Sequence, residues 1–314
     1  MLMQECILNL LPVKEEEKRK FEAAAPQAVH LYARSSTVTR EQLAAATILF
    51  GWPRPECLRE AVNLKWFQTM FAGTEAYQAE GILPPDVRLT TSSGANSLGV
   101  AEHMLACLLA LCQRLPLYRD NQRARLWRAE GNMRTIIGGT VLVVGAGHIG
   151  GAFAGLCQKL GASTIGLKRR VNGPEAGFDR VLPMEELDDL LPQADVVALT
   201  LPHTPETVGL MDEARIARMK DDAILLSAGR GSVLDQQALA RAMAGGKLWG
   251  AALDVTEPEP LTPDSPLWDI PNLLITPHVA GGIRLERTRR ACVQMALDNL
   301  RRYLNGEPLE NRVR

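Results

Sequence analysis

The chain has 314 residues, which is enough for one large domain or two ordinary ones. Hydrophobic residues make up 46% and charged residues 23%, the composition of a globular protein with a sizeable core. Because 35 Lys and Arg balance 36 Asp and Glu, the net charge of -1 argues against a nucleic-acid partner or an anionic membrane surface. Any basic feature must therefore be local.

The cysteines and the N-terminus predict a protein of a reducing, cytoplasmic compartment. None of the 6 cysteines forms a C-x-x-C pair, so they are interpreted as buried thiols and no metal site is predicted. The N-terminus has no basic segment ahead of its apolar run, which makes it a poor signal peptide. The longest apolar stretch, 104–112, has about half the length that a membrane helix needs, so no membrane partner is expected.

The first third of the chain alternates apolar runs with polar helical patterns. Apolar runs predict strands over 6–13, 47–52 and 64–73. The charged run 14–25 predicts a helix. A second helix is expected after Thr39, because Gln42 follows three residues later and completes a capping-box signature. This alternation favours a parallel sheet with helices on its faces.

A long helical segment and a second alternating series follow. Residues 97–127 have a mostly helical pattern, and the first half is apolar nearly all round, which predicts a buried helix. Apolar runs then predict strands over 140–147, 163–168, 195–202, 223–229, 249–255 and 272–278. Helical patterns separate most of these runs, as a doubly wound dinucleotide-binding sheet requires. From Gly281 the chain is polar and helical again.

A glycine-rich turn opens the second series. Gly145, Gly147 and Gly150 have G-x-G-x-x-G spacing, directly after an apolar strand and before a helical pattern. The first glycine permits a tight turn, the second lets the backbone approach a pyrophosphate, and the third lets the helix pack on the strand. Backbone N–H groups at the helix start, around His148 and Ile149, would face the phosphates with the positive end of the helix dipole. In this context the pattern predicts a dinucleotide site.

Three cations follow the next predicted strand. An NAD-specific fold usually has Asp or Glu there, about 20 residues after the glycines, to bind the ribose hydroxyls. Here the position holds Lys168, followed by Arg169 and Arg170, with no acid to balance them. These cations would attract the additional phosphate of NADP. We therefore expect a preference for NADPH, with NAD as the alternative cofactor and a solvated basic turn as the alternative interpretation.

Three polar residues come after the last three predicted strands. They are Arg230, Glu259 and His278. In a doubly wound sheet the carboxyl ends of these strands converge on the cofactor crevice. Taken singly, each residue has an ordinary structural explanation, and Glu257 is an exposed alternative to Glu259. Their joint occurrence in this order favours a catalytic group.

The glycine turn and these segments together resemble the D-2-hydroxyacid dehydrogenase family, in particular glyoxylate/hydroxypyruvate reductases. The resemblance covers nearly the whole chain, through "GTVLVVGAGHIG", "AGRGSVLD", "LDVTEPEPL" and "ITPHVAGG", with "VAEHMLACLLAL" matching a characteristic helix. It implies that Arg230 holds the substrate carboxylate, that His278 supplies a proton and that Glu259 pairs with the imidazolium. The residue types suit these tasks, because arginine offers a rigid fork of donors and imidazole is protonated near neutral pH.

The resemblance also implies further contacts. "FAGTE" matches a loop whose backbone N–H groups hold the substrate carboxylate, which points to Ala72 and Gly73. Asp254 matches a residue near the nicotinamide amide, and Trp52 is a candidate wall of the substrate pocket, with a core position as the alternative. The remaining cofactor candidates lie at strand ends and are Thr200, Pro202, Ala228 and Gly281. Thr256, where the family commonly has an aromatic residue, and the altered "SSGAN" segment leave the substrate open.

The sequence therefore predicts two α/β domains. A doubly wound parallel Rossmann-type cofactor domain over 97–281 is inserted into a smaller flavodoxin-like α/β substrate domain formed by 1–96 and 282–314. The predicted function is NADPH-dependent reduction of a small 2-oxo acid, such as glyoxylate or hydroxypyruvate, to the D-2-hydroxy acid. The alternatives are an NAD-linked 2-hydroxyacid dehydrogenase acting oxidatively and a non-catalytic dinucleotide-sensing protein of the corepressor type. A homodimer is expected, because the family packs the leucine-rich helix matching 98–112 against its twin.

Overall fold

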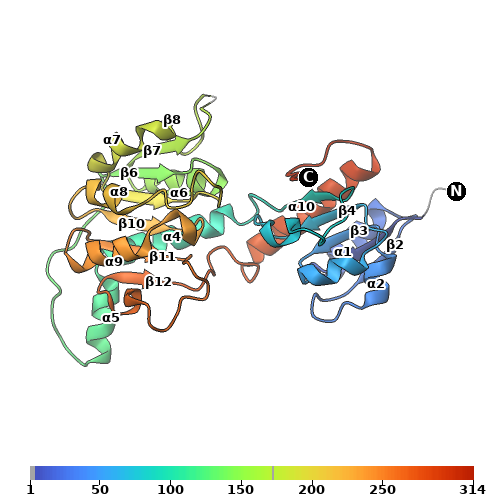
Figure 1. The fold of residues 1–314 in the computed structure, drawn as a ribbon, viewed down its shortest axis with the longest axis horizontal. Coiled ribbons are helices and arrows are strands. Elements are labelled where there is room, and N and C mark those ends of the chain that lie inside the picture. Colours follow the sequence, from blue (N-terminus) through green and yellow to red (C-terminus); the bar gives the residue numbers. More distant parts are fainter. Residues whose placement is uncertain (1–3, 172) are drawn as a thin grey trace. The chain divides into compact units, whose positions relative to one another are not determined.

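The structure, a computed structural model, describes residues 4–171 and 173–314 and divides into two units. The first unit comprises the chain up to Asn96 together with Ile283–Arg314, and the second is Ser97–Gly282. Each unit has its own sheet of parallel strands (Figure 1). Gly282 belongs to the second unit, whereas the sequence pattern assigned it to the first. The assignment of one unit to substrate and the other to dinucleotide stays a prediction.

The first unit is a five-stranded sheet with the strand order β2-β1-β3-β4-β5. This is the flavodoxin-like order, as predicted. Its strands are β1 (Cys6–Asn9), β2 (Val29–Tyr32), β3 (Ile48–Gly51), β4 (Trp66–Thr69) and β5 (Arg88–Thr90). Its helices are α1 (Glu15–Ala24), α2 (Arg40–Ala45), α3 (Glu75–Gln78) and α10 (Glu286–Leu304).

Two of these strands were missing from the sequence prediction. β2 is exposed or only half-buried along its length, and β5 has 3 residues, so neither produces an apolar run. β4 is also shorter than the predicted strand 64–73, because the chain leaves the sheet after Thr69. The capping box at the start of α2 was correct: Thr39 Oγ1 accepts the Gln42 N–H at 3.3 Å.

Both faces of the first sheet are covered by apolar side chains from helices. Phe21 of α1 and Val293 of α10 pack on one face with Trp66 of β4. Leu43 of α2 and Tyr77 of α3 pack on the other. The unit therefore has a core of its own.

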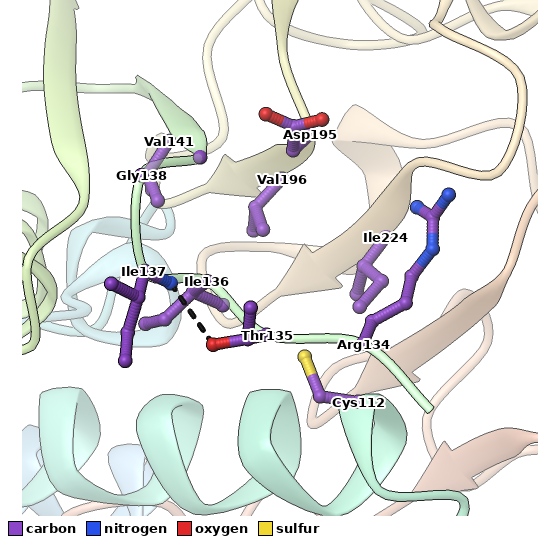
Figure 2. A pocket seen from close by; sticks show the side chains of 11 residues that line it. Cys112, Arg134, Thr135, Ile136, Ile137, Gly138, Val141, Asp195, Val196 and Ile224 are labelled. Atoms are coloured by element: carbon purple, nitrogen blue, oxygen red, sulfur yellow. Dashed lines mark hydrogen bonds between the residues drawn. The ribbon is translucent and has the colours of Figure 1, made fainter. Parts of the chain in front are cut away.

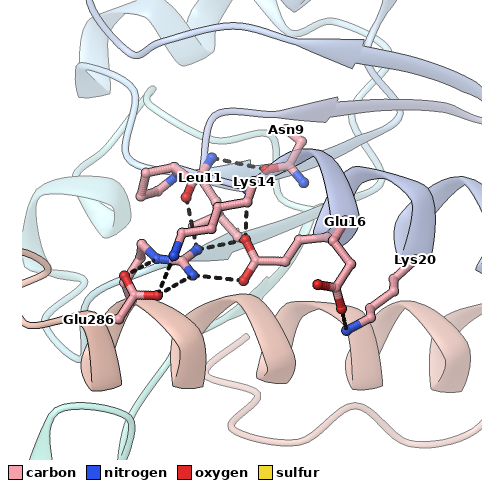
Figure 3. A network of polar contacts seen from close by, with 9 residues as sticks. Asn9, Leu11, Lys14, Glu16, Lys20 and Glu286 are labelled. Atoms are coloured by element: carbon pink, nitrogen blue, oxygen red, sulfur yellow. Dashed lines mark hydrogen bonds and ion pairs between the residues drawn. The ribbon is translucent and has the colours of Figure 1, made fainter.

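An ion-pair network joins the start of α1 to the start of α10 (Figure 3). Arg289 is 7% exposed, and its guanidinium donates to both carboxylate oxygens of Glu17, at 2.7 and 2.8 Å. It also donates to both oxygens of Glu286, which pairs in turn with Lys14 at 2.7 Å. These contacts fix the N-terminal turn of α10, the helix that begins 3 residues after the first unit resumes at Ile283.

The second unit is a seven-stranded parallel sheet in the order β12-β11-β10-β9-β6-β7-β8. Numbered from β6, this is the 3-2-1-4-5-6 order of a Rossmann fold with one further strand, which confirms the predicted fold class. The strands are β6 (Thr140–Val144), β7 (Ser163–Lys168), β8 (Arg180–Pro183), β9 (Val196–Leu199), β10 (Ile224–Ser227), β11 (Gly250–Leu253) and β12 (Leu273–Ile275). The prediction of six strands missed β8, an edge strand with no fully buried residue.

Helices cover both faces of this sheet. They are α4 (Ser97–Cys112), α6 (His148–Lys159), α7 (Leu187–Leu190), α8 (Glu213–Arg218) and α9 (Gln236–Ala244). A further helix, α5 (Leu115–Arg123), follows α4 and contacts it. Leu108 of α4 and Phe153 of α6 pack on one face. Ile216 of α8 and Leu239 of α9 pack on the other. This two-sided cover is the doubly wound arrangement.

The segment 97–127, predicted to be mostly helical, contains two helices, α4 and α5. It breaks where Arg114 takes a left-handed backbone with φ 54°, ahead of Pro116 in the first turn of α5. Among the described residues no single helix is both long and apolar enough to cross a membrane. Only α4 and α5 taken together, bent by 68°, meet that criterion of length and composition.

Candidate functional site

The glycine turn lies between β6 and α6 and has the backbone geometry that its spacing predicts. Gly145 has φ 114°, a conformation that side chains rarely allow, and Gly147 is the N-cap of α6. A Cβ atom on Gly150 would lie 2.3 Å from the carbonyl oxygen of Gly145, so α6 packs directly against the turn. Thr200 Oγ1 donates to the same carbonyl at 2.8 Å and ties the end of β9 to the turn.

The start of α6 has room for a phosphate group. A Cβ atom on Gly147 would have no other atom within 4 Å, and the Gly147 N-cap offers no side chain to satisfy the free N–H groups of the first turn. A pocket of about 580 Å³ is lined by Gly147, His148, Lys168 and Glu175, together with residues along α6. The start of α6 thus combines open space, unsatisfied N–H donors and the positive end of the helix dipole. These features suit the binding of a dinucleotide pyrophosphate.

The basic strand end contains an acidic partner that the sequence pattern did not reveal. Lys168, the last residue of β7, forms an ion pair with Glu175. The expectation of three cations with no balancing acid is therefore wrong for Lys168. Glu175 escaped notice because it lies seven positions further along, in a loop without periodic pattern, and not beside the cations in sequence.

The other two cations remain at the surface. Arg169 and Arg170 are exposed, and the described residues include no ion-pair partner for either side chain. Arg169 lies near enough to Glu206 to act on it. Thr204, through a hydrogen bond, and to a smaller extent Arg169 hold the pKa of Glu206 below its usual value. Positive charge at this strand end is therefore reduced, though not removed.

Glu259 and His278 are in direct contact. Nδ1 of His278 lies 2.8 Å from Oε2 of Glu259, while Oε1 of Glu259 accepts the backbone N–H of Thr256 at 3.1 Å. Because both carboxylate oxygens are engaged, the imidazole ring is held through Nδ1 in a defined orientation. The contact involves Glu259 and not Glu257, whose carbonyl instead accepts Gln236 Nε2 at 3.3 Å.

The backbone at His278 has a left-handed conformation, with φ 49°. Asp254, buried at the end of β11, stabilises it from two directions. Its carbonyl accepts the His278 N–H at 2.8 Å, and its carboxylate accepts the N–H groups of Val279 at 3.0 Å and Ala280 at 3.1 Å. A conformation that is unfavourable for a residue other than glycine is thus held by three hydrogen bonds to a single residue. In this structure Asp254 supports the histidine loop, and its predicted contact with a nicotinamide amide stays a prediction.

Two further polar residues join this group, and sequence reasoning did not single them out. Thr276 Oγ1 donates to Asp254 Oδ1 at 2.6 Å, and His103 Nε2 lies 3.1 Å from Thr276 Oγ1. His103 belongs to the helix motif "VAEHMLACLLAL". The apolar pattern of this motif predicts a buried helix and gives no sign that its one histidine is part of a polar group. The thiol of Cys107, one turn on, lies 3.6 Å from His103 Nε2, and burial raises the pKa of this thiol to about 11.

Arg230 follows β10 and is half-buried, with Nη1 donating to the Gly229 carbonyl at 3.0 Å. The next residue, Gly231, packs against the loop that carries Glu259. A Cβ on Gly231 would lie 2.1 Å from the Thr256 carbonyl oxygen, so only glycine fits there. Arg230, Asp254 and His278 therefore follow three adjacent strands, β10, β11 and β12, at their carboxyl ends.

The remaining cofactor candidates lie at the same edge of the sheet. Thr200 and Pro202 follow β9, and Ala228 follows β10, where its N–H donates to the Leu199 carbonyl at 3.0 Å. Gly281 has φ 63° and lies in the loop after His278, near the end of the second unit. His203 and Ser232, which the sequence reasoning passed over, meet beside this group, with Nδ1 of His203 2.7 Å from Ser232 Oγ.

The predicted substrate contacts Trp52, Ala72 and Gly73 belong to the first unit. They follow β3 and β4, at the carboxyl edge of that sheet. Trp52 is half-buried against Phe71, with ring centroids 6.3 Å apart, and it lines a pocket of about 930 Å³. Its ring is therefore neither a fully buried core group nor an exposed one.

A separate pocket of about 300 Å³ opens at the opposite edge of the second sheet (Figure 2). Its lining includes Asp195 and Ile224, at the amino ends of β9 and β10. The Asp195 carboxylate is engaged there, accepting the Thr140 N–H at 2.8 Å and pairing with Lys220 at 2.6 Å. Because dinucleotides bind at the carboxyl ends of the strands, this pocket is not part of the candidate site.

Known proteins resemble this chain over most of its length. The family model described as "D-isomer specific 2-hydroxyacid dehydrogenase, NAD binding domain" matches residues 105–280. The D-3-phosphoglycerate dehydrogenase of Mycobacterium tuberculosis is 33% identical over 292 residues, 93% of this chain and 52% of that protein. Glyoxylate/hydroxypyruvate reductase B of Pectobacterium carotovorum is 32% identical over 260 residues, 82% of this chain and 81% of that protein. The chain thus spans about half the length of the phosphoglycerate dehydrogenases that it matches.

Solved structures of the same family superpose on this chain over nearly its whole length. A D-isomer specific 2-hydroxyacid dehydrogenase family protein from Aeromonas salmonicida superposes with a TM-score of 0.86 at 34% identity, covering 99% of both chains. A D-isomer specific 2-hydroxyacid dehydrogenase from Xanthobacter autotrophicus, in complex with NADPH and MES, gives a TM-score of 0.80 at 30% identity, covering 99% of this chain and 98% of that one. The matched family model spans more than half of the residues and contains the glycine turn and the Glu259–His278 pair. The chain belongs to the D-isomer specific 2-hydroxyacid dehydrogenase family.

Proposed function

We propose that the protein reduces a small 2-oxo acid to the D-2-hydroxy acid with NADPH as the hydride donor. The observation that carries this proposal is the 2.8 Å contact between His278 Nδ1 and Glu259 Oε2, at the carboxyl end of a Rossmann-type sheet. An imidazole held by a carboxylate on one nitrogen offers the other nitrogen for proton transfer. Such a pair beside a dinucleotide cradle suits carbonyl reduction.

In the proposed reaction each residue has a separate task. When bound, the nicotinamide cofactor supplies a hydride to the carbonyl carbon of the substrate. Arg230 binds the adjacent carboxylate and fixes the carbonyl in place. Nε2 of His278 gives its proton to the carbonyl oxygen, which becomes the hydroxyl of the product, and the neutral imidazole regains a proton from solvent. Glu259 orients the ring and stabilises the imidazolium before transfer. Trp52, Ala72 and Gly73 stay predicted substrate contacts.

Two comparisons support a small substrate and NADPH. The Pectobacterium relative is named a glyoxylate/hydroxypyruvate reductase, and the Xanthobacter structure contains NADPH. In this chain Arg169 and Arg170 are exposed cations at the end of β7, where a 2′-phosphate would lie. We therefore propose glyoxylate or hydroxypyruvate as substrate and NADPH as the preferred cofactor.

A substrate panel tests this proposal directly. The purified protein is incubated with NADPH or NADH and, in turn, glyoxylate, hydroxypyruvate, pyruvate and a larger 2-oxo acid, while the absorbance of the reduced nicotinamide is followed. We expect turnover with one or both of the first two acids and a higher kcat/KM with NADPH than with NADH. Binding of NADPH without turnover of any 2-oxo acid would instead favour a dinucleotide-sensing protein.

One alternative has specific support. The Mycobacterium relative is named a D-3-phosphoglycerate dehydrogenase, and Glu175 pairs with Lys168 where the proposal needs positive charge. Both observations favour an NAD-linked enzyme that oxidises a 2-hydroxy acid. The same assay run in reverse, with NAD or NADP and a panel of D-2-hydroxy acids that includes 3-phosphoglycerate, separates the two proposals.

We also propose that the protein is a homodimer. The predicted interface helix, α4, buries Val100, Leu108 and Leu111 in its own unit, so it offers less free apolar surface than the sequence suggested. Five exposed apolar side chains instead follow it along the chain, at Leu115, Leu126, Trp127, Met133 and Ile137. We propose that a partner copy covers apolar side chains of this segment. A monomeric mass by light scattering at micromolar concentration would contradict this proposal.

We propose a cytoplasmic location from the cysteine usage. All 6 cysteines are free, and burial raises the pKa of Cys157 to about 12 and that of Cys292 to about 11. Free, unreactive thiols are typical of proteins in reducing compartments. Fractionation of the source cells with an antibody against the protein tests this proposal.

A further inference from the structure

The ion pair between Lys168 and Glu175 places an acid inside the predicted cofactor pocket. The two side chains are 36% and 32% exposed, so the pair is accessible to a ligand. Both residues line the same pocket as Gly147 and His148, the start of α6. Glu175 therefore lies close to the position where an NAD-specific fold has its ribose-binding acid, although it comes from a different loop.

The loop that carries Glu175 is held in place by close packing. A Cβ on Gly177 would lie 2.2 Å from the Gly151 carbonyl, which shows how tightly this loop approaches α6. Thr164 Oγ1 donates to the Gly177 carbonyl at 3.3 Å, and the Phe178 N–H donates to the Glu175 carbonyl at 3.3 Å. Phe178 itself packs against the core under β7. The carboxylate is thus presented to Lys168 by a backbone with little freedom.

We propose that Glu175 is a cofactor-specificity residue, which binds Lys168 and competes with the 2′-phosphate of the cofactor for it. This inference rests on the proposed use of NADPH. With NADPH the 2′-phosphate must displace the Glu175 carboxylate from Lys168. The displaced carboxylate then stays close to the phosphate and repels it. With NADH the pair can remain, and the carboxylate is available to the ribose hydroxyls. Glu175 therefore reduces the affinity for NADPH relative to NADH, whereas Arg169 and Arg170 increase it.

Two fragments of the cofactor separate this effect from catalysis. Adenosine 2′,5′-bisphosphate and 5′-AMP differ only in the 2′-phosphate, and their dissociation constants can be measured by calorimetry without any turnover. In Glu175→Gln we expect the bisphosphate to bind about three- to tenfold more tightly, the range for a partly exposed charge pair, and 5′-AMP to bind no more tightly than before. Glu213→Gln is the matched control, because Glu213 pairs with Arg241 at 3.1 Å on the same unit, outside the pocket.

A second background tests whether Glu175 acts through Lys168. In Lys168→Met, the change from Glu175 to Gln should alter the ratio of the two constants much less than in the wild-type background. An unchanged ratio in Glu175→Gln, an equal change in Glu213→Gln, or an undiminished effect in Lys168→Met would each overturn the inference. If wild type prefers 5′-AMP, the proposed use of NADPH fails, while the response of the ratio to Glu175→Gln still decides the role of Glu175. Unchanged thermal unfolding of the variants shows that the fold is retained.

Discussion

Glu259 touches His278 with one carboxylate oxygen and the Thr256 backbone with the other, at 2.8 and 3.1 Å. The backbone contact fixes the carboxylate, and the carboxylate then fixes the ring. A carboxylate in contact with Nδ1 orients the imidazole, so that the other ring nitrogen can serve in proton transfer. The pair thus sets the direction of proton donation.

We expect Glu259→Gln to lower kcat for 2-oxo acid reduction by about tenfold or more. A neutral amide oxygen binds Nδ1 of His278 less strongly than the carboxylate does, so the ring is held less firmly for proton transfer. Steady-state kinetics with NADPH measures kcat, with Glu257→Gln as the matched control. An equal loss in Glu257→Gln would show that the local charge, and not the contact with His278, is responsible.

Replacing His278 itself separates binding from chemistry. We expect His278→Ala to lower kcat by about 100-fold or more, the usual worth of a positioned general acid, and to leave NADPH binding nearly intact. Fluorescence titration of the reduced nicotinamide gives the affinity, and steady-state kinetics gives kcat. Near-normal turnover in this variant would exclude His278 as the proton donor.

Asp254 supports His278 through backbone contacts, and its removal should therefore act on catalysis from a distance. Asp254→Ala deletes the acceptor for Thr276 Oγ1, Val279 N and Ala280 N, which are 2.6 to 3.1 Å from the carboxylate. We expect a loss of about 1–3 kcal/mol in the free energy of unfolding, the cost of unpaired buried groups. Because the His278 loop is loosened, kcat should fall as well.

The conservative change at a neighbouring residue provides the control for that experiment. Thr276→Ser keeps the hydroxyl that donates to Asp254, whereas Thr276→Val removes it and keeps the shape. Activity should survive the first change and fall with the second. If Asp254→Ala changes the cofactor affinity and not kcat, Asp254 acts as the nicotinamide contact that the family resemblance implies.

The parts of this site that the sequence predicts are those that depend on local spacing. Apolar runs, and the glycine and polar residues that end them, predict the glycine turn and the ends of β10, β11 and β12. Arg230, Glu259 and His278 were singled out because they follow these strands. The partners of Lys168 and of Asp254 were not. Glu175 reaches Lys168 because Gly177 packs on α6, and Asp254 binds backbone N–H groups of Val279 and Ala280. Contacts of this kind depend on tertiary packing and on the backbone, which carry no signal in residue type.

Secondary structure shows the same division. Strands buried on both faces, such as β9 and β10, produce apolar runs and were found. The edge strands β2 and β8 are partly exposed and contain polar residues, so they lack the apolar run by which strands were predicted. Both lie at an end of their sheets, where a strand has only one neighbour and needs less apolar surface.

Two glycines of the turn should respond differently to the same substitution. A Cβ on Gly150 would meet the Gly145 carbonyl at 2.3 Å and Val143 Cγ1 at 2.8 Å, so Gly150→Ala should lower the free energy of unfolding by about 1–3 kcal/mol. Gly147 has φ -99° and open space around its Cβ position, so Gly147→Ala should retain the stability of the wild type.

The second substitution should instead weaken cofactor binding. The new methyl group of Gly147→Ala would occupy the space that a pyrophosphate needs, and we expect about tenfold weaker NADPH binding, equivalent to about 1.4 kcal/mol. Thermal unfolding and fluorescence titration of both variants check the pair of predictions. Normal NADPH affinity in Gly147→Ala would place the phosphates away from this turn.

The network of Arg289, Glu17 and Glu286 should make the first unit sensitive to acid (Figure 3). Hydrogen bonds from Arg289 and then Lys14 lower the pKa of Glu286 to about 2, and a hydrogen bond from Arg289 lowers the pKa of Glu17. A carboxyl group with a lowered pKa in the folded state stabilises the protein above its unfolded pKa of about 4.3, and this contribution is lost as pH falls through the folded value.

We therefore expect the stability of the wild type to fall more steeply between pH 5 and about pH 2 than that of Glu286→Gln. The variant should be less stable than wild type at pH 7, because the amide accepts weaker hydrogen bonds from Arg289 and Lys14. The difference between the two proteins should shrink toward pH 2, where the wild-type carboxyl is protonated too. Urea unfolding at a series of pH values measures this difference.

Glu60→Gln, which removes a single surface pair with Arg40 at 2.6 Å, serves as the control and should follow the wild type closely. A difference between wild type and Glu286→Gln that is constant with pH would mean that the carboxylate charge of Glu286 contributes nothing to the stability of the first unit.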